Sequence, residues 1–190
     1  MKKILIIAYS YPSEYSPGDA NFVEQQAKII SYRHDVCVIS LVRVPFSEQY
    51  KYWLNQLPKL PELEIDSDND RLRVYRQYVV RYIPYERLFF QWYLKTFNRV
   101  VQQVFHDWGK PDIIHAHNNW PAGLVGSRLS KTYSIPMLIT EHSTSFDELM
   151  VKNYWFRKEV EQASNDYHKI ITVSPYLAEC LKSFLDPQKI

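Results

Sequence analysis

The stretch that decides the fold runs from Lys110 to Phe146 and reads KPDIIHAHNNWPAGLVGSRLSKTYSIPMLITEHSTSF. A short apolar segment within it ends in His115 and His117. A turn and a helical segment follow, and a second apolar segment then ends in Glu141 and His142. In open α/β sheets, ligands bind in the crevice at the carboxyl ends of the parallel strands. Ionisable side chains at two such strand ends therefore predict a ligand crevice at this edge of a sheet.

Apolar and helical segments alternate outward from this stretch in both directions. Strands are expected at residues 4–8, 36–42, 72–80, 112–116, 136–140 and 169–173, and helices at 21–32, 86–108, 120–133, 156–167 and 175–185. Such alternation is typical of helices that pack on both faces of a parallel sheet. The sequence therefore predicts an α/β fold with a doubly wound, Rossmann-like parallel sheet of about six strands in a single domain.

Three local expectations accompany this topology. Residues 45–70 carry three prolines and an acidic end, and we expect an irregular excursion there. Residues 72–80 alternate basic and apolar side chains, which fits an edge or half-exposed strand. Asp19 or Asn21 is expected to cap the helix at 21–32, whose N-terminus would then face the crevice as an anion site.

Composition and charge narrow the class of protein. The chain has 190 residues, of which 46% are hydrophobic and 23% charged, and this suits one well-buried globular domain. No run approaches the ~20 apolar residues of a membrane span, and the N-terminus lacks a signal-peptide core, so we expect a cytoplasmic protein. Cys37 and Cys180 stand singly, as buried reduced thiols do. A net charge of +2 and tyrosines without an RNA-binding pattern argue against nucleic acid as a partner.

The basic residues are unevenly distributed along the chain. Seven Arg and Lys residues fall between positions 71 and 99, against Glu86 alone. Phe89 and Trp92 lie off the apolar stripe of the helix expected at 86–108, so we expect them to be exposed. A basic, aromatic segment can attract an anionic membrane face or a phosphorylated ligand, although a solvated surface is the commoner outcome.

The residues at the strand ends suit several kinds of chemistry. His115 and His117 are two apart on a strand and point to the same side, which makes a metal pair conceivable. Further ligands would have to come from Glu141 or His142 without the spacing typical of zinc sites, so no metal is expected. His115 is interpreted as a hydrogen-bonded core histidine and His117 as facing the crevice. Glu141, His142 and Ser143 together suit a polyhydroxylated ligand such as a sugar.

Two common motifs are missing from the sequence. The loop after the first strand contains one glycine, Gly18, and no GxGxxG, which argues against a dinucleotide site. The turn from Pro17 to Ala20 can still present backbone N–H groups to a phosphate or a hydroxyl, and a plain turn accounts for it equally well. No GxSxG turn is present either, which argues against a serine hydrolase.

The chain resembles the N-terminal half of bacterial family 4 glycosyltransferases of the GT-B architecture, in the order and spacing of the segments KILIIAYSYP, GDANFVEQQAKIIS, HDVCVIS, PDIIHAHNNWPAGLVGSRLSK, IPMLITEHSTSF and HKIITVSPYLAECL. The two strand ends HAH and TEH carry the resemblance together. It implies a retaining transfer, of hexosyltransferase type, from a nucleotide-sugar donor to a cell-surface polysaccharide or lipid-linked acceptor. It implies neither a metal nor a cofactor beyond the donor substrate.

The resemblance also assigns roles to particular residues. His117 matches the strand-end histidine that approaches the transferred sugar, and it is the expected catalytic residue. Gly18 and Asp19 match a loop that usually carries a Gly-Gly pair near the donor phosphates, so that Asp19 in place of the second glycine favours contact with an acceptor hydroxyl. The remaining substrate-binding residues implied for the acceptor pocket are Asn118, Glu141, His142 and Ser143.

The resemblance sets the expected domain organisation as well. Residues 1–190 are expected to form the acceptor-side N-terminal domain, with the C-terminal donor-binding domain absent and the chain alone inactive. The complete enzyme is expected in the cytoplasm, at the inner face of the membrane and in contact with anionic lipid. Two alternatives stay open, namely a stand-alone flavodoxin-like binding module without catalysis and a metal-dependent hydrolase.

Overall fold

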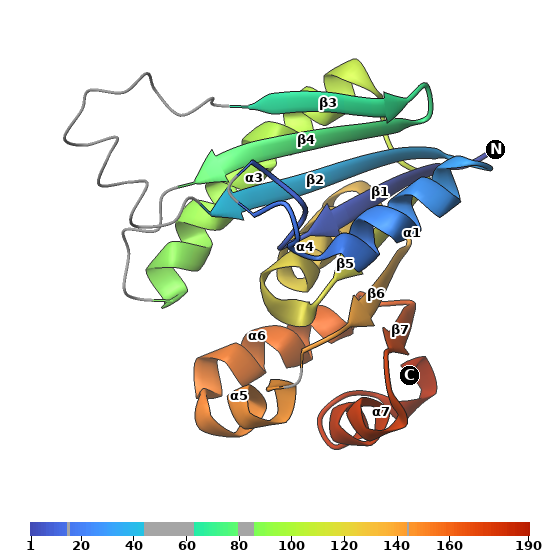
Figure 1. Cartoon of the computed structure of the whole chain (residues 1–190). Coiled ribbons are helices and arrows are strands. Elements are labelled where there is room, and N and C mark those ends of the chain that lie inside the picture. The colour runs from blue at the N-terminus through green and yellow to red at the C-terminus, as the bar shows by residue number, and fades with distance from the viewer. Residues whose placement is uncertain (15, 44–62, 80–85, 144) are drawn as a thin grey trace. The chain divides into compact units, whose positions relative to one another are not determined.

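The computed structural model describes residues 1–14, 16–43, 63–79, 86–143 and 145–190 (Figure 1). Seven strands fall within these ranges: β1 (Lys3–Ala8), β2 (Asp35–Arg43), β3 (Glu64–Asn69), β4 (Leu72–Val79), β5 (Ile113–His117), β6 (Met137–Glu141) and β7 (Lys169–Thr172). Their order in the sheet is β3-β4-β2-β1-β5-β6-β7. Pairing is parallel between β2 and β4, β5 and β6, and β6 and β7, whereas β3 runs antiparallel to β4. The predicted Rossmann-like α/β fold is confirmed, with seven strands in place of about six.

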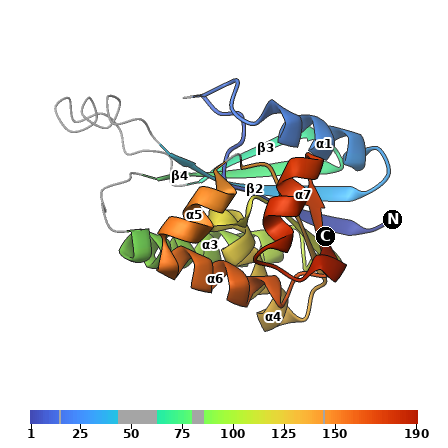
Figure 2. The same ribbon diagram turned by 90° about the horizontal axis from the view of Figure 1, so that it is seen from below.

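Helices connect the strands on both faces of the sheet. The described helices are α1 (Asn21–Ser31), α3 (Glu86–Asp107), α4 (Leu124–Tyr133), α5 (Phe146–Lys152), α6 (Tyr154–Ser164) and α7 (Pro175–Lys182), with short turns η1 (Asn119–Gly123) and η2 (Pro187–Lys189). Figure 2 shows α1 and α3 on opposite faces of β2 and β4, as a doubly wound sheet requires. The described helices include α5, which the sequence did not predict.

The chain divides into two compact units. The first comprises Ala8–Lys110 with Met1, and the second comprises Pro111–Ile190 with Lys2–Ile7. The N-terminal strand is tied into the second unit where β5 begins, because the backbone N–H of Lys3 donates to Asp112 Oδ2 over 2.7 Å and the backbone N–H of Asp112 donates to the Lys3 carbonyl over 2.8 Å.

In the first unit, β4 is paired along both of its sides, so the prediction of an edge strand there is wrong. The edge belongs to β3, an acidic strand that the sequence did not predict. Arg76 of β4 is only 8% exposed, and its guanidinium donates to Glu64 Oε1 over 2.9 Å and to the carbonyl of Pro12 over 2.9 Å. Asp66 Oδ2 lies 3.4 Å from the same guanidinium. The basic residues of β4 indicated exposure, but β3 supplies carboxylates that compensate a buried arginine.

Two further expectations in the first unit need correction or lie outside the described ranges. The residue before α1 is Ala20, in a left-handed conformation with φ 49°, and no side chain caps the helix there. The predicted cap from Asp19 or Asn21 is therefore wrong. Most of the predicted excursion, residues 44–62, lies outside the described residues.

The long helix α3 buries its apolar stripe, as predicted. Phe90, Tyr93, Phe97 and other stripe residues are at most 5% exposed. Phe89 is also buried, at 3% exposure, with its ring centroid 5.9 Å from that of Tyr93, so its predicted exposure is wrong. The buried face of the helix is therefore wider than the apolar stripe and includes the position of Phe89 next to it. The large exposed apolar side chain on this helix is Leu88.

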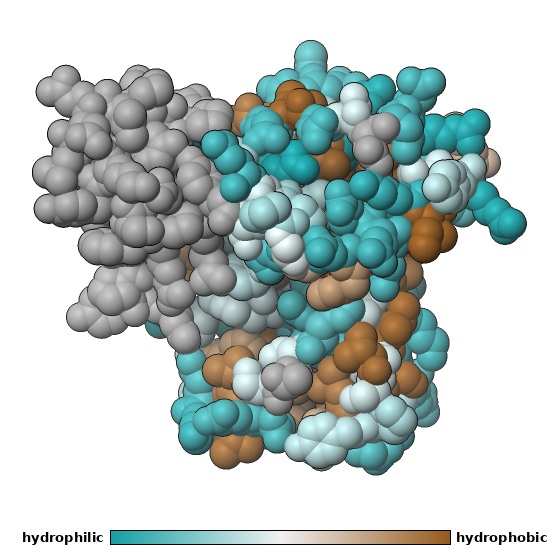
Figure 3. Space-filling model, in the orientation of Figure 1, coloured by the Kyte–Doolittle hydropathy of each residue, from teal (hydrophilic) through white to brown (hydrophobic). Residues whose placement is uncertain are grey.

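The two edge strands of the sheet differ in chemistry. β3 carries Glu64 and Asp66, the kind of charged residue that protects a sheet edge. β7 exposes Ile171, and Val173 follows directly after the strand and is exposed as well. Figure 3 shows apolar side chains among polar ones on the second unit. None of the described helices is long and apolar enough to cross a membrane.

Candidate functional site

The ends of β5 and β6 bring four of the predicted site residues together. The strands pair in parallel with His117 opposite Thr140, so both end at the same edge of the sheet. Asn118 follows β5 directly, Glu141 is the last residue of β6, and His142 follows it. The backbone N–H of Asn118 donates to the Thr140 carbonyl over 2.8 Å and continues the ladder past the strands. The crevice edge predicted from the sequence is therefore a compact group of polar residues.

Three imidazole rings lie next to one another at this edge. The rings of His115 and His117 lie 4.4 Å apart between centroids, and those of His117 and His142 lie 5.3 Å apart at an interplanar angle of 14°. Nδ1 of His117 is 3.0 Å from Nε2 of His142, a hydrogen-bond distance. Nε2 of His115 is 2.8 Å from the hydroxyl of Thr140. His115 is thus a hydrogen-bonded core histidine, as the sequence predicts.

Glu141 is 1% exposed, and both of its carboxylate oxygens accept hydrogen bonds from the chain. Oε2 accepts from the backbone N–H of Asn119 over 2.7 Å and from its side-chain amide over 2.6 Å. Oε1 accepts from the backbone N–H groups of His142 over 3.0 Å and Ser143 over 2.8 Å. We call this group the Glu141 clamp. It ties the loop after β5 to the loop after β6.

Asn118 adopts an unusual backbone conformation, with φ 70° and ψ 144°. Non-glycine residues rarely occupy this region, and such strain persists only where surrounding contacts enforce it. Here Asn118 Oδ1 accepts from the backbone N–H of His142 over 3.0 Å, and the carbonyl of Asn118 accepts from Gly123 over 2.9 Å. A Cβ atom at Gly123 would lie 2.7 Å from Cδ1 of Ile139 and 2.8 Å from the Tyr167 hydroxyl, so any other residue would force these side chains to shift where η1 approaches β6.

Burial sets the charges of this group. It lowers the pKa of His115 to about 4 and that of His117 to about 2, and repulsion from neighbouring imidazoles adds to both shifts. It also lowers the pKa of His142. Burial raises the pKa of Glu141, and the N–H groups of the Glu141 clamp oppose that rise because they favour the carboxylate. The three histidines are therefore neutral at neutral pH.

These lowered pKa values predict an acid-sensitive fold. A histidine whose folded pKa lies below its unfolded value of about 6.5 keeps its full stabilising contribution above that pH and loses it as pH falls. The free energy of unfolding should thus fall below about pH 6.5, by up to about 1.4 kcal/mol per pH unit for each of His115 and His117. Urea unfolding over a pH series measures the slope. His115→Gln should flatten this slope.

Three buried polar atoms in this unit have no hydrogen-bond partner among the described residues. They are His117 Nε2, Asn119 Oδ1 and the hydroxyl of Tyr167. Buried polar atoms are normally paired, and exceptions often mark functional positions. His117 Nε2 is the one that belongs to a predicted site residue. It is the ring nitrogen left over once Nδ1 has bonded to His142.

Gly18 and Asp19 belong to the first unit, whereas His115, His117 and His142 belong to the second. Both are exposed, and the backbone N–H of Asp19 donates to the Ser16 carbonyl over 3.2 Å. A Cβ added at Gly18 would meet nothing within 4 Å, so neither space nor backbone angle demands glycine there. The predicted site residues therefore come from both units, a hydrogen-bonded group from the second and an exposed turn from the first.

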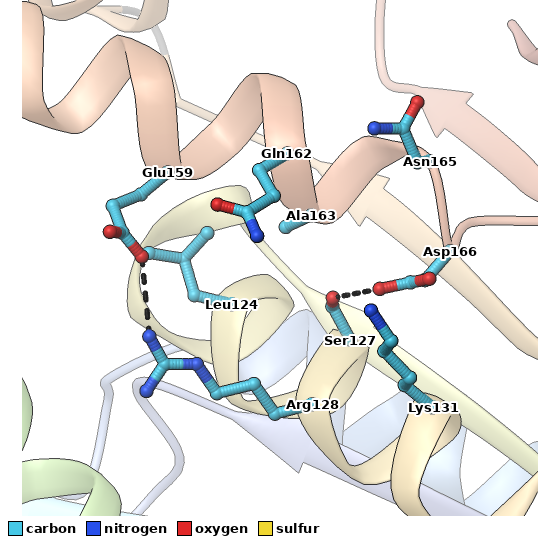
Figure 4. Close-up of a pocket in the computed structure, with 9 residues that line it drawn as sticks. All are labelled: Leu124, Ser127, Arg128, Lys131, Glu159, Gln162, Ala163, Asn165 and Asp166. Carbon is cyan, nitrogen blue, oxygen red and sulfur yellow. Dashed lines mark hydrogen bonds and ion pairs between the residues drawn. The ribbon is translucent and has the colours of Figure 1, made fainter.

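Figure 4 shows a pocket between α4 and α6, and none of the predicted site residues lines it. Its volume is about 420 Å³. Ser127 donates to Asp166 Oδ2 over 2.6 Å across it, and Arg128 pairs with Glu159 over 3.3 Å. The ion pair joins the two helices, and the bond from Ser127 joins α4 to the turn after α6. Within the described ranges, no group of three or more His, Cys, Asp or Glu side chains is arranged to hold a metal ion.

Sequence reasoning missed Asn119 as a member of the site. Asn119 is fully buried, and its backbone N–H and its side-chain amide donate two of the four hydrogen bonds of the Glu141 clamp. The doubled asparagine after a strand that ends in histidine was a usable signal, because asparagine both tolerates strained turns and satisfies nearby carboxylates.

The fold defines a class, the Rossmann-like domains of the GT-B architecture. Arabidopsis thaliana UGT89C1 in complex with UDP-L-rhamnose superposes with a TM-score of 0.56 at 14% identity, over 100% of this chain and 50% of that one. An E. coli trehalose-6-phosphate protein bound with UDP-2-fluoro glucose gives 0.60 at 10% identity, over 95% and 43%. The UDP-GlcNAc 2-epimerase of Methanocaldococcus jannaschii gives 0.52 at 14% identity, over 99% and 44%. At these identities the likeness concerns the fold alone.

Residues 20–190 match the model of Glycosyltransferase Family 4, and the chain belongs to that family. An uncharacterized glycosyltransferase of Methanocaldococcus jannaschii is 28% identical over 145 residues, which are 72% of this chain and 39% of that protein. The chain thus spans well under two thirds of the length of the relatives it matches.

Proposed function

We propose that the complete protein transfers a sugar from a nucleotide-sugar donor to a hydroxyl of a glycan or lipid-linked acceptor, with retention of configuration. In this proposal residues 1–190 are the acceptor-side half, which does not turn over substrate alone. Membership of Glycosyltransferase Family 4 supports the reaction class. The UDP-sugars bound to two of the structural neighbours support a nucleotide sugar as the donor class. As the resemblance implies, the proposal needs no metal or further cofactor.

The observation that carries the proposal is the buried ring nitrogen of His117. Nε2 has no partner among the described residues, while Nδ1 is held 3.0 Å from His142. The ring is neutral, because burial lowers its pKa to about 2. A neutral, oriented imidazole suits a hydrogen bond to a sugar hydroxyl better than a permanent charge does. Such a bond accelerates transfer to the extent that it strengthens in the transition state.

The other predicted residues take two kinds of role in this proposal. Ser143 is half-buried and lies beside His142, where its side chain can reach the acceptor. Asn118 and Glu141 hold the loops beside His117 in place, since their oxygens already accept hydrogen bonds from the chain. Gly18 and Asp19 offer an exposed turn to a donor phosphate or an acceptor hydroxyl.

A substrate screen with the complete protein tests the proposed function. UDP-, GDP- and dTDP-sugars are incubated with the protein and with glycan or lipid-linked acceptors, and release of the nucleotide diphosphate is measured. Proton NMR of the product then gives the anomeric configuration. Transfer with retention supports the proposal. The proposal is refuted if the protein binds none of the nucleotide sugars and releases no nucleotide diphosphate from them. An inverted product would refute the retaining mechanism.

We also propose that the basic surface of α3 contacts anionic lipid. Arg87, Lys95 and Arg99 are exposed on this helix, beside the exposed Leu88. Cationic side chains around an apolar one favour binding at an anionic membrane face. The buried Phe89 takes no part in this contact.

Vesicle sedimentation gives the corresponding prediction. The protein should co-sediment with vesicles that contain phosphatidylserine, and the double variant Arg87→Glu and Lys95→Glu should lose most of that retention, because about 1 kcal/mol is expected from each cation near the surface. Lys152→Glu and Lys158→Glu, at exposed positions of α5 and α6, form the matched control. Equal retention of both double variants would disprove the α3 surface.

A further inference from the structure

The two nitrogens of the His117 ring have different surroundings. Nδ1 faces Nε2 of His142 at 3.0 Å. Nε2 is buried and has no partner among the residues that the structure describes. A neutral imidazole carries one N–H, so only one of these nitrogens is a donor. Which nitrogen carries the proton decides whether His117 offers a ligand a donor or an acceptor.

The surroundings favour the proton on Nδ1. If Nε2 of His142 donated to His117, the proton of His117 would sit on Nε2 as a buried N–H without an acceptor. If His117 Nδ1–H donates to His142, only a lone pair is left unfilled. Orphaned buried donors are rarer in proteins than unfilled acceptors. Protonation of both rings is opposed, because burial lowers the pKa of both histidines.

Two hydrogen bonds from its backbone N–H hold the main chain of His142 beside His117. The backbone N–H of His142 lies 3.0 Å from Asn118 Oδ1 and 3.0 Å from Glu141 Oε1. The planes of its ring and of the His117 ring are nearly parallel, at an angle of 14°, as a hydrogen bond in the ring plane requires. The acceptor is thus held from its main chain by the Glu141 clamp and by the strained Asn118. This arrangement restrains the position of His142 whatever ligand is bound.

We infer that His142 is a positioning residue, which holds His117 in the Nδ1–H tautomer so that His117 Nε2 accepts a hydrogen bond from a hydroxyl of the sugar ligand. The identity of that ligand rests on the proposed function, and the tautomer does not. His142 therefore acts through His117 instead of touching the substrate.

NMR of the histidine rings tests the tautomer directly. In protein labelled with ¹⁵N-histidine, long-range ¹H–¹⁵N spectra above the pKa values of the rings distinguish protonated from unprotonated ring nitrogens. His117 should show a protonated Nδ1 and an unprotonated Nε2. His142→Leu removes the acceptor and should shift His117 toward the other tautomer, whereas His142→Gln, whose amide oxygen can accept, should retain the wild-type pattern. A protonated Nε2 in the wild-type protein would overturn the inference even if a variant fails to fold.

Turnover by the complete protein separates this inference from the proposed function. An enzyme histidine in the wrong tautomer loses much of its activity, so His142→Leu should lower kcat at least about tenfold with little change in KM. His142→Gln should recover most of that loss. If NMR shows the inferred tautomer but the protein transfers no sugar, the proposed function is refuted and the positioning role of His142 is not. Transfer at wild-type rates by His142→Leu, or a wild-type Nε2–H, would refute the positioning role alone.

Discussion

His117→Ala is expected to lower kcat of the complete protein by roughly 100-fold, the effect of removing one oriented hydrogen-bonding group from an active site. The reason is local, because Nε2 of His117 is the buried ring nitrogen without a partner among the described residues. KM for the donor should change much less, since a bond that strengthens in the transition state acts mainly on kcat. Steady-state kinetics with the donor found in the substrate screen measures both constants.

Two controls accompany this prediction. His117 is 2% exposed, so alanine leaves a cavity, and thermal unfolding must show that the variant is folded at the assay temperature. His117→Gln fills more of the space and should be nearly as inactive, because its amide cannot take the place of an oriented ring nitrogen. His106→Ala, at an exposed imidazole on α3, should keep full activity. A folded His117→Ala variant with near-normal kcat would assign His117 a structural role only.

Glu141→Ala is expected to destabilise the fold by about 3–5 kcal/mol, because it leaves buried N–H groups without an acceptor. Four N–H groups of Asn119, His142 and Ser143 donate to this carboxylate. Urea unfolding of wild type and variant measures the difference in the free energy of unfolding. Glu141→Gln should lie between the two, since its amide keeps one acceptor oxygen and turns a donor toward the other N–H groups.

Glu148→Ala is the matched control for this prediction. Glu148 lies on α5 and pairs with Lys152 over 2.6 Å, but both side chains are exposed. Exposed ion pairs contribute little, so the loss should stay within about 1 kcal/mol. If Glu141→Ala were as mild as Glu148→Ala, the Glu141 clamp would not hold the two loops together in solution.

Much of the fold could be predicted from the sequence because buried parallel strands are local apolar runs. Such runs form β1, β2, β5 and β6, and the predicted bounds of each strand agree with the observed ones within one residue. β3 is not predicted, because residues 64–69 are acidic and form no apolar run. Pairing with β4 and the bond between Glu64 and the buried Arg76 stabilise this strand. The burial of Phe89 is not predicted, because periodicity indicates which face of a helix is apolar. It does not indicate how much of the helix surface the rest of the protein covers.

The sequence predicts most of the residues of the candidate site. It does not predict which of them are hydrogen-bonded to the chain itself. His117 and His142 fall at neighbouring strand ends, and parallel pairing brings them together. The sequence placed Glu141 among the ligand contacts, because a carboxylate beside serines suits a sugar. The structure shows its oxygens engaged by N–H groups of the chain, among them those of Asn119, which sequence reasoning did not single out.

The pattern of strands and helices along Lys110–Phe146 depends on residues that are neighbours in the sequence. It was enough to predict the Rossmann-like fold and to place histidines at the ends of adjacent parallel strands. Hydrogen bonding between loops that are over twenty residues apart is not local. It depends on the strained turn at Asn118 and on the packing of η1 against β6. For that reason the tertiary structure was needed to show that Glu141 is committed to the loops and that His117 keeps one ring nitrogen unpaired by the described residues.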